Sequence, residues 1–493
     1  MNLICNLFSS LFPTLEGSAA DRDREQAIDS SIRFAVLGLV KGSVFWLLIS
    51  SVLGLVVSIK LHSPDYLGDS EFLTYGKVYP AFWNALVFGW LFNAGLACCA
   101  WILARLSGRP SGNSGLLAIS SGAWNVAVVI GLIGIFRGEL SPYRMLEFPS
   151  YAAPFLFAAF GGIGLWIVLT FKARAYRSAF ASQWYALAGV FSFVWIYTVA
   201  QVMIFCLPAQ GVFQAVVASW FKGNLFGLVI APFAFATIYY LIPKALGQHI
   251  VGYRQAGIAF WSWIIFSSCS GLAALVSGPF PAWVASVGVV ASFGLFLPIT
   301  IFSMQFLSSL LASFSKIWDT ISIRYIFYGV VALIASTLLI IVGSLRSVQD
   351  TVQFSQFDDG VRFLFLAGFA GMSFMGALYY ILPRLLNKEL ASAGLADLQF
   401  WVQGLSIFVI ALCAITGGIA HGSLLNGSTA DAVAILQSTQ SYLVLATIGY
   451  AMFLCGSMAY VVSFTWMLLA PRSEKEKSAD LIKSAPELEY TPL

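Results

Sequence analysis

The sequence is poor in charged residues and in histidine. Only 10% of its 493 residues are charged, whereas 59% are hydrophobic, and three are histidines. Soluble globular proteins devote about a quarter of their residues to charge, so this composition excludes an ordinary soluble fold. The alternating ten-residue pattern of membrane β-strands is also missing, which disfavours an outer-membrane barrel. The balance predicts an all-α polytopic membrane protein.

The seven cysteines do not form a recognisable metal or haem motif. No Cys-x-x-Cys pair occurs, which excludes covalent c-type haem attachment and the usual spacing of iron–sulfur ligands. Most of the cysteines lie inside apolar runs, where a free thiol packs as a small hydrophobic side chain. We therefore expect them to be packing residues.

After Arg33, the chain contains twelve apolar segments long enough to cross a bilayer, which requires about 20 residues. Their approximate limits are 34–59, 80–104, 116–136, 151–171, 184–206, 223–243, 257–277, 284–309, 323–344, 361–383, 397–419 and 441–470. They predict a bundle over residues 34–470, with an N-terminal arm, 1–33, before it. The charged tail, 471–493, is expected to be disordered.

Lysine and arginine are concentrated in alternate loops. Most of the 26 cations fall on the side that carries both chain ends, whereas aspartates gather in the opposite loops. Cytoplasmic loops of membrane proteins carry an excess of Lys and Arg. The distribution therefore predicts that the N- and C-termini are cytoplasmic.

One phrase occurs twice. Residues 239–246 read Tyr-Tyr-Leu-Ile-Pro-Lys-Ala-Leu, and residues 379–386 read Tyr-Tyr-Ile-Leu-Pro-Arg-Leu-Leu. Each phrase closes a long apolar segment, one beginning at Gly223 and the other at Gly360. A proline followed by a cation predicts that the helix ends or kinks at the membrane surface. We expect these two segments to be inner helices of the bundle.

Polar groups inside the predicted spans are few. No aspartate or glutamate lies in the middle of a span, although a membrane-embedded ionisable residue would be a functional candidate. Lys41 lies near the start of the first segment, where it either snorkels to the surface or serves an internal role. The other mid-span polar residues are suited to interhelical hydrogen bonds; they are mainly Asn84, Asn93, Asn125, Gln201, Asn224, Gln305 and Gln403.

The three histidines are expected to be solvated loop residues. His62 and His421 follow the first and eleventh segments on the predicted outward side, and His249 lies in a cytoplasmic loop. Two histidines on the outward side and one on the cytoplasmic side cannot converge on a metal in the membrane core. The pattern therefore predicts no histidine-bound metal.

A series of short motifs occurs along the segments in a fixed order. They are Tyr75-Gly76-Lys77 with Pro80 and Asn84-Ala85, then Trp124-Asn125, Leu146-Glu147-Phe148-Pro149, Gly223-Asn224 with Gly227, the phrase from Tyr239 to Lys244, Phe260-Trp261, and Leu378 to Arg384. In their order and flanks, these segments resemble subunit I of the haem–copper oxidases, nearest to the cbb-type cytochrome c oxidases. The resemblance implies a twelve-helix bundle with cytoplasmic termini, in the bacterial inner membrane, beside other respiratory subunits.

The resemblance also implies six histidine ligands, two for a low-spin haem b, one for a high-spin haem and three for copper. The chain has other residues at the aligned positions: Phe82 in the second segment, Gly223 in the sixth, Ala273 and Ala274 in the seventh, and Val361 and Phe363 in the tenth. The tyrosine of the cbb type falls near Ser267. We therefore predict no catalytic, cofactor-binding or metal-binding residues, and neither haem nor copper.

Phe82 and Phe363 are the informative replacements. Bulky apolar side chains would fill the space of a lost haem, because an unfilled cavity costs roughly 24 cal/mol per Å³. The alternative is that the chain is simply rich in phenylalanine, of which it has 42. Both interpretations stay open at this point.

Three functions stay open as well. The first is a degenerate, non-catalytic structural subunit of a respiratory electron-transport complex, partnered by lipid and by subunits such as a membrane cytochrome c or an active oxidase, and without nucleic acid. The second is an oxidase or other redox subunit that binds haem through unexpected ligands. The third is a transporter that uses the former cofactor cavity. The third class usually requires a buried carboxylate, although Pro232 and Pro298 could break helices in the manner of transporters.

Overall fold

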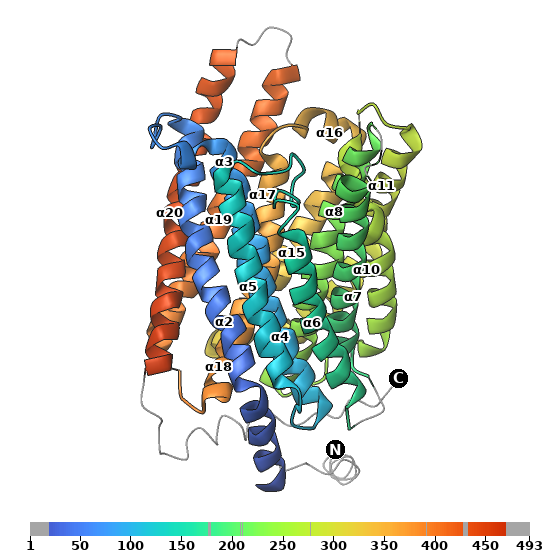
Figure 1. The fold of residues 1–493 in the computed structure, drawn as a ribbon, viewed down its shortest axis with the longest axis vertical. Helices are drawn as coiled ribbons and strands as arrows, with labels where there is room; N and C mark the ends of the chain where they lie inside the picture. The colour runs from blue at the N-terminus through green and yellow to red at the C-terminus, as the bar shows by residue number, and fades with distance from the viewer. Residues whose placement is uncertain are drawn as a thin grey trace.

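The computed structural model describes residues 19–175, 179–207, 209, 211–276, 278–390, 392–426 and 432–469. The start of the arm and the charged tail, 471–493, lie outside the described residues, so the expectations for them stay predictions. Over the described residues the chain is helical, and twelve helices are long and apolar enough to cross a membrane. The predicted all-α bundle with twelve spans is confirmed (Figure 1).

The spans follow one another in the predicted order. The first six are α2 (Ala19–His62), α3–η2–α4 (Tyr75–Asn84, Ala85–Leu91, Phe92–Ser107), α5 (Ser114–Arg137), α6 (Ala153–Lys172), α7 with η3 (Ala181–Gln201, Val202–Cys206), and α8–η4–α9 (Phe213–Asn224, Leu225–Ile230, Ala231–Leu246). The next six are α10 with η6 (Ala256–Ser270, Gly271–Leu275), α11–α12–η7–α13 (Ala282–Gly294, Phe296–Phe302, Ser303–Leu307, Ser308–Leu311), α15 (Ile321–Gly343), α17–η8–α18 (Phe357–Phe363, Leu364–Gly371, Met372–Leu386), α19 (Ala393–Asn426) and α20 (Ala432–Leu469). Short helices in the connections are η1 (Glu71–Leu73), η5 (Tyr253–Gln255), α14 (Phe314–Asp319) and α16 (Arg346–Val352).

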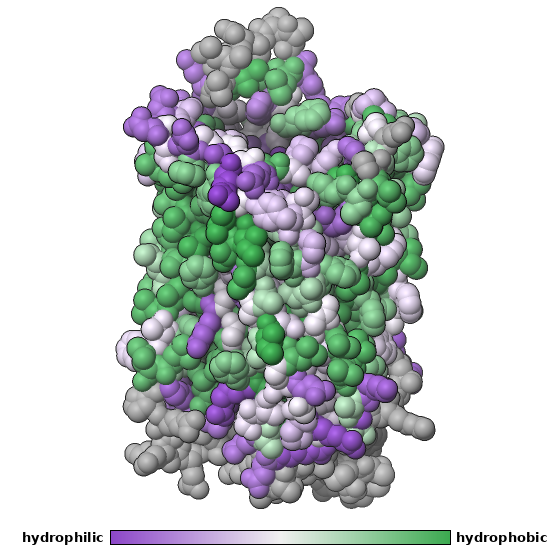
Figure 2. Space-filling model, in the orientation of Figure 1, coloured by the Kyte–Doolittle hydropathy of each residue, from purple (hydrophilic) through white to green (hydrophobic). Residues whose placement is uncertain are grey.

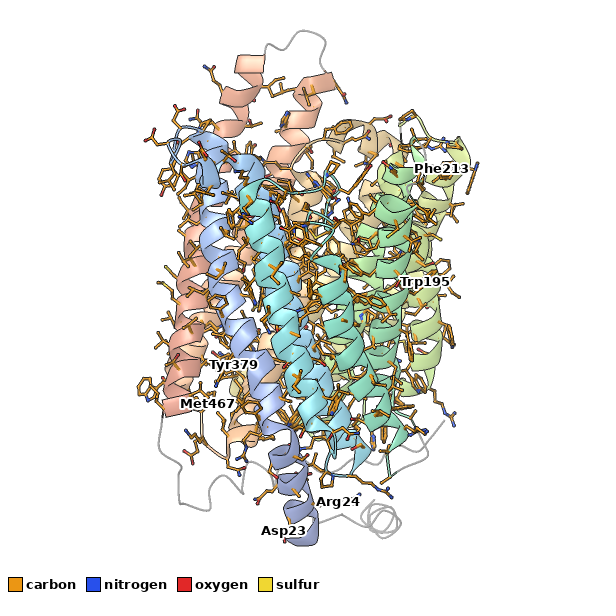
Figure 3. The ribbon with its side chains drawn as sticks, in the orientation of Figure 1. Asp23, Arg24, Trp195, Phe213, Tyr379 and Met467 are labelled. Carbon is orange, nitrogen blue, oxygen red and sulfur yellow. The ribbon has the colours of Figure 1, made fainter. Side chains whose placement is uncertain are left out.

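The first described helix begins, and the last one ends, on the same side of the bundle. Figure 3 places Arg24 and Met467 at one end and Phe213 near the other. We call these the inner end and the outer end, and the assignment of the inner end to the cytoplasm stays a prediction from the cations. Between them, Figure 2 shows a broad hydrophobic belt with hydrophilic residues at both ends, as a bilayer requires.

Three spans form the centre of the bundle. Every residue in the most apolar 18-residue window of α3–η2–α4 and of α8–η4–α9 is buried, and 94% of that window is buried in α17–η8–α18. The repeated Tyr-Tyr phrase correctly predicts the last two as inner helices, but no comparable sequence signal marks the first. Each of the three contains a π-helical stretch, η2, η4 or η8, a feature that often lies at functional sites.

The second tyrosine of each phrase joins the three central spans. The rings of Tyr240 and Tyr380 both lie edge-on to Trp101 of α4, with centroids 5.6 and 6.2 Å away. The Trp101 indole N–H in turn donates a hydrogen bond of 3.0 Å to Asp29 on α2. Asp29 also accepts two hydrogen bonds from Arg105, which ties α2 to α4 near the inner end.

The first tyrosine of each phrase faces outward from the central spans. The Tyr239 hydroxyl donates to Gln305 on η7 at 2.5 Å, and the Tyr379 hydroxyl donates to Gln399 on α19. Each copy of the phrase therefore makes the same two contacts: one tyrosine ring packs on Trp101, and the other tyrosine hydroxyl donates to a glutamine.

Several helices begin earlier than the predicted apolar segments. The first helix begins at Ala19, ahead of the apolar segment at residue 34, and the Asp29–Arg105 ion pair holds these early turns against the bundle. The sixth and tenth spans begin at Phe213 and Phe357, before the glycines that the sequence suggested as their starts. The early turns were missed because they carry polar residues that lower the local hydropathy.

Candidate functional site

Two of the aligned ligand positions lie in a packed aromatic cluster. The ring centroids of Phe82 and Phe363 are 5.9 and 5.7 Å from that of Tyr450, and Phe363 lies 5.5 Å from Phe453. Both phenylalanines are buried. A Cβ atom on Gly54 of α2 would stand 2.9 Å from the Phe82 ring, so no free space remains there. A phenyl ring has no lone pair to donate to iron, and these residues do not fit a bis-histidine haem site.

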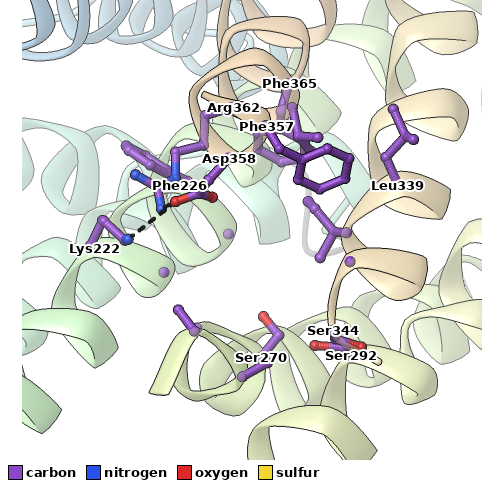
Figure 4. A pocket seen from close by; sticks show the side chains of 18 of the residues that line it. Lys222, Phe226, Ser270, Ser292, Leu339, Ser344, Phe357, Asp358, Arg362 and Phe365 are labelled. Atoms are coloured by element: carbon purple, nitrogen blue, oxygen red, sulfur yellow. Dashed lines mark ion pairs between the residues drawn. The ribbon is translucent and has the colours of Figure 1, made fainter. Parts of the chain in front are cut away.

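The other five aligned positions line one cavity. Gly223, Ser267, Ala273, Ala274 and Val361 surround a hollow of about 510 Å³ near the outer end, between α8, η6, α15 and α17. Figure 4 shows this outer cavity from close by. The sequence left open whether these positions enclose a filled or an empty space. The structure has packed the Phe82–Phe363 region and left this second region hollow.

The three aligned copper positions in the outer cavity carry no donor side chain. Hydrogen and methyl side chains at Gly223, Ala273 and Ala274 offer no lone pair to a metal. A Cβ on Gly223 would lie 2.6 Å from the Gly271 Cα atom, so the short helix η6 has closed onto α8. Across the described ranges, no group of three or more His, Cys, Asp or Glu residues could hold a metal ion.

Charged residues gather at one side of the outer cavity. Lys222 and Arg362 both approach the same oxygen, Oδ2 of Asp358, with Lys222 at 3.8 Å. Next to them, Arg144 lies 3.0 Å from Asp359, which also accepts a 2.6 Å hydrogen bond from the Tyr79 hydroxyl. Lys222 and Arg362 are only 15% and 11% exposed, so their charges are largely removed from water.

A buried carboxylate lies against the second span, where the sequence indicated none. Glu147 is buried in the connection between α5 and α6, and it accepts a 2.9 Å hydrogen bond from Asn84 of α3. Burial raises the pKa of Glu147 to about 7, although the Asn84 bond opposes the shift. The loop turns inward at Met145, which has a positive φ of 67°. Only the apolar neighbours of Glu147 in the sequence could have signalled this.

Most of the mid-span amides form the expected interhelical bonds. Asn93 and Asn125 exchange hydrogen bonds of 3.1 and 3.0 Å between α4 and α5, and the Trp46 indole also donates to Asn125. Asn224 donates to the Ser268 carbonyl oxygen. Within the part of the chain that the structure describes, the Gln403 amide has no partner.

Lys41 lies on the surface of the bundle. Its side chain is exposed on α2, which excludes the role inside this bundle that the sequence left open. A lysine stem in this position can carry its charge to the interface.

The histidines stay apart, as predicted, but two placements are wrong, because His62 and His421 lie in helices rather than in loops. His62 is the last residue of α2 and lies 3.1 Å from the Thr447 hydroxyl, and His249 lies in the connection after α9. His421 belongs to helix α19 rather than to a loop. The last turns of α19 and the first turns of α20 extend together beyond the other helices at the outer end (Figure 1).

Comparison with known proteins now identifies the superfamily. The sequence model described as Cytochrome C and Quinol oxidase polypeptide I matches residues 35–452. The chain belongs to this family.

Individual relatives agree with this assignment at low identity. A cytochrome c oxidase subunit 1 homolog of Agrobacterium tumefaciens (strain T37) is 23% identical, with 92% of this chain and 86% of the relative covered. The cbb3-type cytochrome c oxidase subunit CcoN1 of Stutzerimonas stutzeri is 22% identical, with 89% and 95% covered. A solved haem–copper terminal oxidase dimer matches with a TM-score of 0.72 at 15% identity, over 93% of this chain and 86% of that chain. The oxidase subunit I fold therefore extends over nearly the whole chain.

Proposed function

We propose that this member of the oxidase subunit I family is a degenerate, non-catalytic subunit of a membrane respiratory complex. The observation that carries the proposal is the contact between Phe82, Phe363 and Tyr450 at two aligned haem-ligand positions. Haem iron requires axial nitrogen, sulfur or oxygen donors, and the Phe82 and Phe363 side chains supply none. No redox step can be derived through such a site.

A structural role agrees with what the chain retains. The bundle keeps the central spans of an oxidase subunit and exposes large apolar side chains along its length, among them Phe34, Trp195 and Trp261. Such a surface suits lipid and the spans of other subunits. We propose the bacterial inner membrane as its location, and a membrane cytochrome c or an active oxidase as its partner.

The partner can be sought by purifying the full chain in mild detergent and identifying co-purified proteins by mass spectrometry. The proposal expects a stable complex with at least one cytochrome-containing subunit, recognised by its optical spectrum. Purification of this chain alone, with a haem b spectrum of its own, would instead support the redox alternative.

A further inference from the structure

The outer cavity has a cationic end that its own carboxylate only partly neutralises. Lys222 and Arg362 share a single oxygen of Asp358, and that side chain is 51% exposed. At 3.8 Å, the Lys222 ammonium group is beyond hydrogen-bonding distance of this oxygen, and it has no closer acceptor among the described residues. A largely buried ammonium group without a hydrogen-bond acceptor is costly, so an added anion in the cavity would stabilise it.

One part of the outer cavity wall is apolar, whereas another part carries hydroxyl groups, among them those of Ser270, Ser292 and Ser344. Phe226, Trp263 and Phe365 line the apolar part together with Leu339, and Figure 4 shows Phe365 and Leu339 across the hollow from Lys222. A volume of about 510 Å³ falls within the ~300–1,000 Å³ range of sites for small molecules.

Aromatic side chains close the cavity toward the inner end. The Trp263 ring lies 4.9 Å from Phe235, which stacks on Phe302 at 4.2 Å. The Trp263 indole also donates to the Gly227 carbonyl oxygen at 2.8 Å, which fixes its ring in place. The arrangement therefore suits a molecule that binds from the outer side and does not cross.

We propose that the outer cavity binds an amphipathic anion. Its carboxylate or phosphate group would accept hydrogen bonds from Lys222 and Arg362, and its apolar body would lie between Phe226, Trp263 and Phe365. Charge-assisted bonds to a partly buried ammonium and guanidinium supply the affinity for the head group. The proposal goes beyond the structural role above.

The test uses the full chain in nanodiscs of zwitterionic phosphatidylcholine, with 12-bromododecanoate as the probe. Bromine quenches the fluorescence of nearby tryptophan. The part of the quenching that is lost in Trp263→Phe therefore reports binding in this cavity. We expect saturable quenching by the carboxylate and none by the neutral 12-bromododecanol. Equal quenching by the two probes would overturn the proposal, because membrane partitioning alone would then explain the signal.

Two variants test the head-group contact and the free volume of the cavity separately. Lys222→Gln should weaken binding by about tenfold, the equivalent of one charge-assisted hydrogen bond. Ala274→Phe keeps every charge but fills the cavity, and it should abolish the saturable signal. The matched control is Lys77→Gln, at a half-buried outer-end lysine that donates to the Glu71 carbonyl oxygen, and the affinity of this variant should be unchanged. Unchanged binding in both cavity variants would contradict the proposal.

Anionic lipid distinguishes the two sources of such a head group. If a phospholipid supplies it, phosphatidylglycerol in the nanodisc should raise the apparent Kd of the probe more in the wild-type chain than in Lys222→Gln. If a free amphiphile supplies it, phosphatidylglycerol should raise the Kd of the wild type and of Lys222→Gln equally, because an anionic bilayer repels the anionic probe in both.

Discussion

Phe82 and Phe363 stabilise the bundle by filling it. Each is buried, and both contact Tyr450. In the haem-binding relatives that the sequence resembles, a ligand is expected there, so the same positions would serve metal binding and not packing. The residue type thus changes the role of the position while the helices around it stay the same.

Removing either phenyl ring from this aromatic cluster should destabilise the folded protein. We expect Phe82→Ala or Phe363→Ala to destabilise the fold by about 3–5 kcal/mol, because a phenyl-sized void would remain. Thermal unfolding in detergent measures the effect, with Phe34→Ala as the matched control at a phenylalanine that is 84% exposed. Equal changes in Tm for the buried and the exposed positions would contradict the packing role.

Glu147 should make stability depend on pH. Its ordinary pKa of 4.5 rises to about 7 in the folded protein, mainly through burial. Below pH 4.5 the carboxyl group is protonated in both states. As pH rises from 4.5 to about 7, the unfolded state loses the proton and the folded state keeps it, so up to about 3 kcal/mol of stability is lost.

Glu147→Gln should remove this dependence, because glutamine stays neutral and can still accept from Asn84. The Tm of the variant should exceed that of the wild type by several degrees at pH 8, and the difference should shrink toward pH 5. Glu139→Gln, at an exposed glutamate in the same connection, is the control and should leave the pH profile unaltered. A wild-type pH profile in Glu147→Gln would show that Glu147 does not titrate in this range.

At the scale of the elements, close contact between η6 and α8 defines one edge of the outer cavity. The contact depends on glycine at both sides, since a Cβ on Gly223 would stand 2.6 Å from the Gly271 Cα atom. Backbone atoms cannot move aside as a flexible side chain can. The two elements would therefore have to separate to admit a side chain.

Gly223→Val should destabilise the bundle by about 1–3 kcal/mol, the usual range for overpacking. Gly122→Val on α5 is the control, because a Cβ there meets nothing within 4 Å and the substitution leaves a similar span intact. Thermal unfolding of the two variants in the same detergent compares them. A loss at Gly223 no larger than that at Gly122 would show that η6 is free to move away from α8.

At the scale of the molecule, the twelve spans could be predicted because the length of an apolar run is a local property of the sequence. The inner position of α8–η4–α9 and α17–η8–α18 also had a local signal, in the repeated Tyr-Tyr phrase. The burial of Glu147 and the position of the outer cavity had no comparable local signal. Glu147 is buried because a loop folds inward between spans, and the outer cavity arises where several segments far apart in the sequence fail to fill a shared space.

The aligned site positions illustrate the same difference. Sequence comparison grouped Gly223, Ala273 and Val361 through a shared family role, and the structure brings them to one cavity. The sequence comparison could not show that the region around Phe82 is packed while the outer cavity is hollow. Packing depends on partners such as Tyr450 and Gly54, which no spacing rule connects to Phe82.

The most direct test of a non-catalytic role is the cofactor content of the chain itself. Protein purified from its own membrane and freed of partners would be measured for haem by its reduced-minus-oxidised spectrum, and for iron and copper by elemental analysis. The account predicts no haem b band and far less than one iron or copper per chain. A haem b band with stoichiometric iron and copper would contradict it.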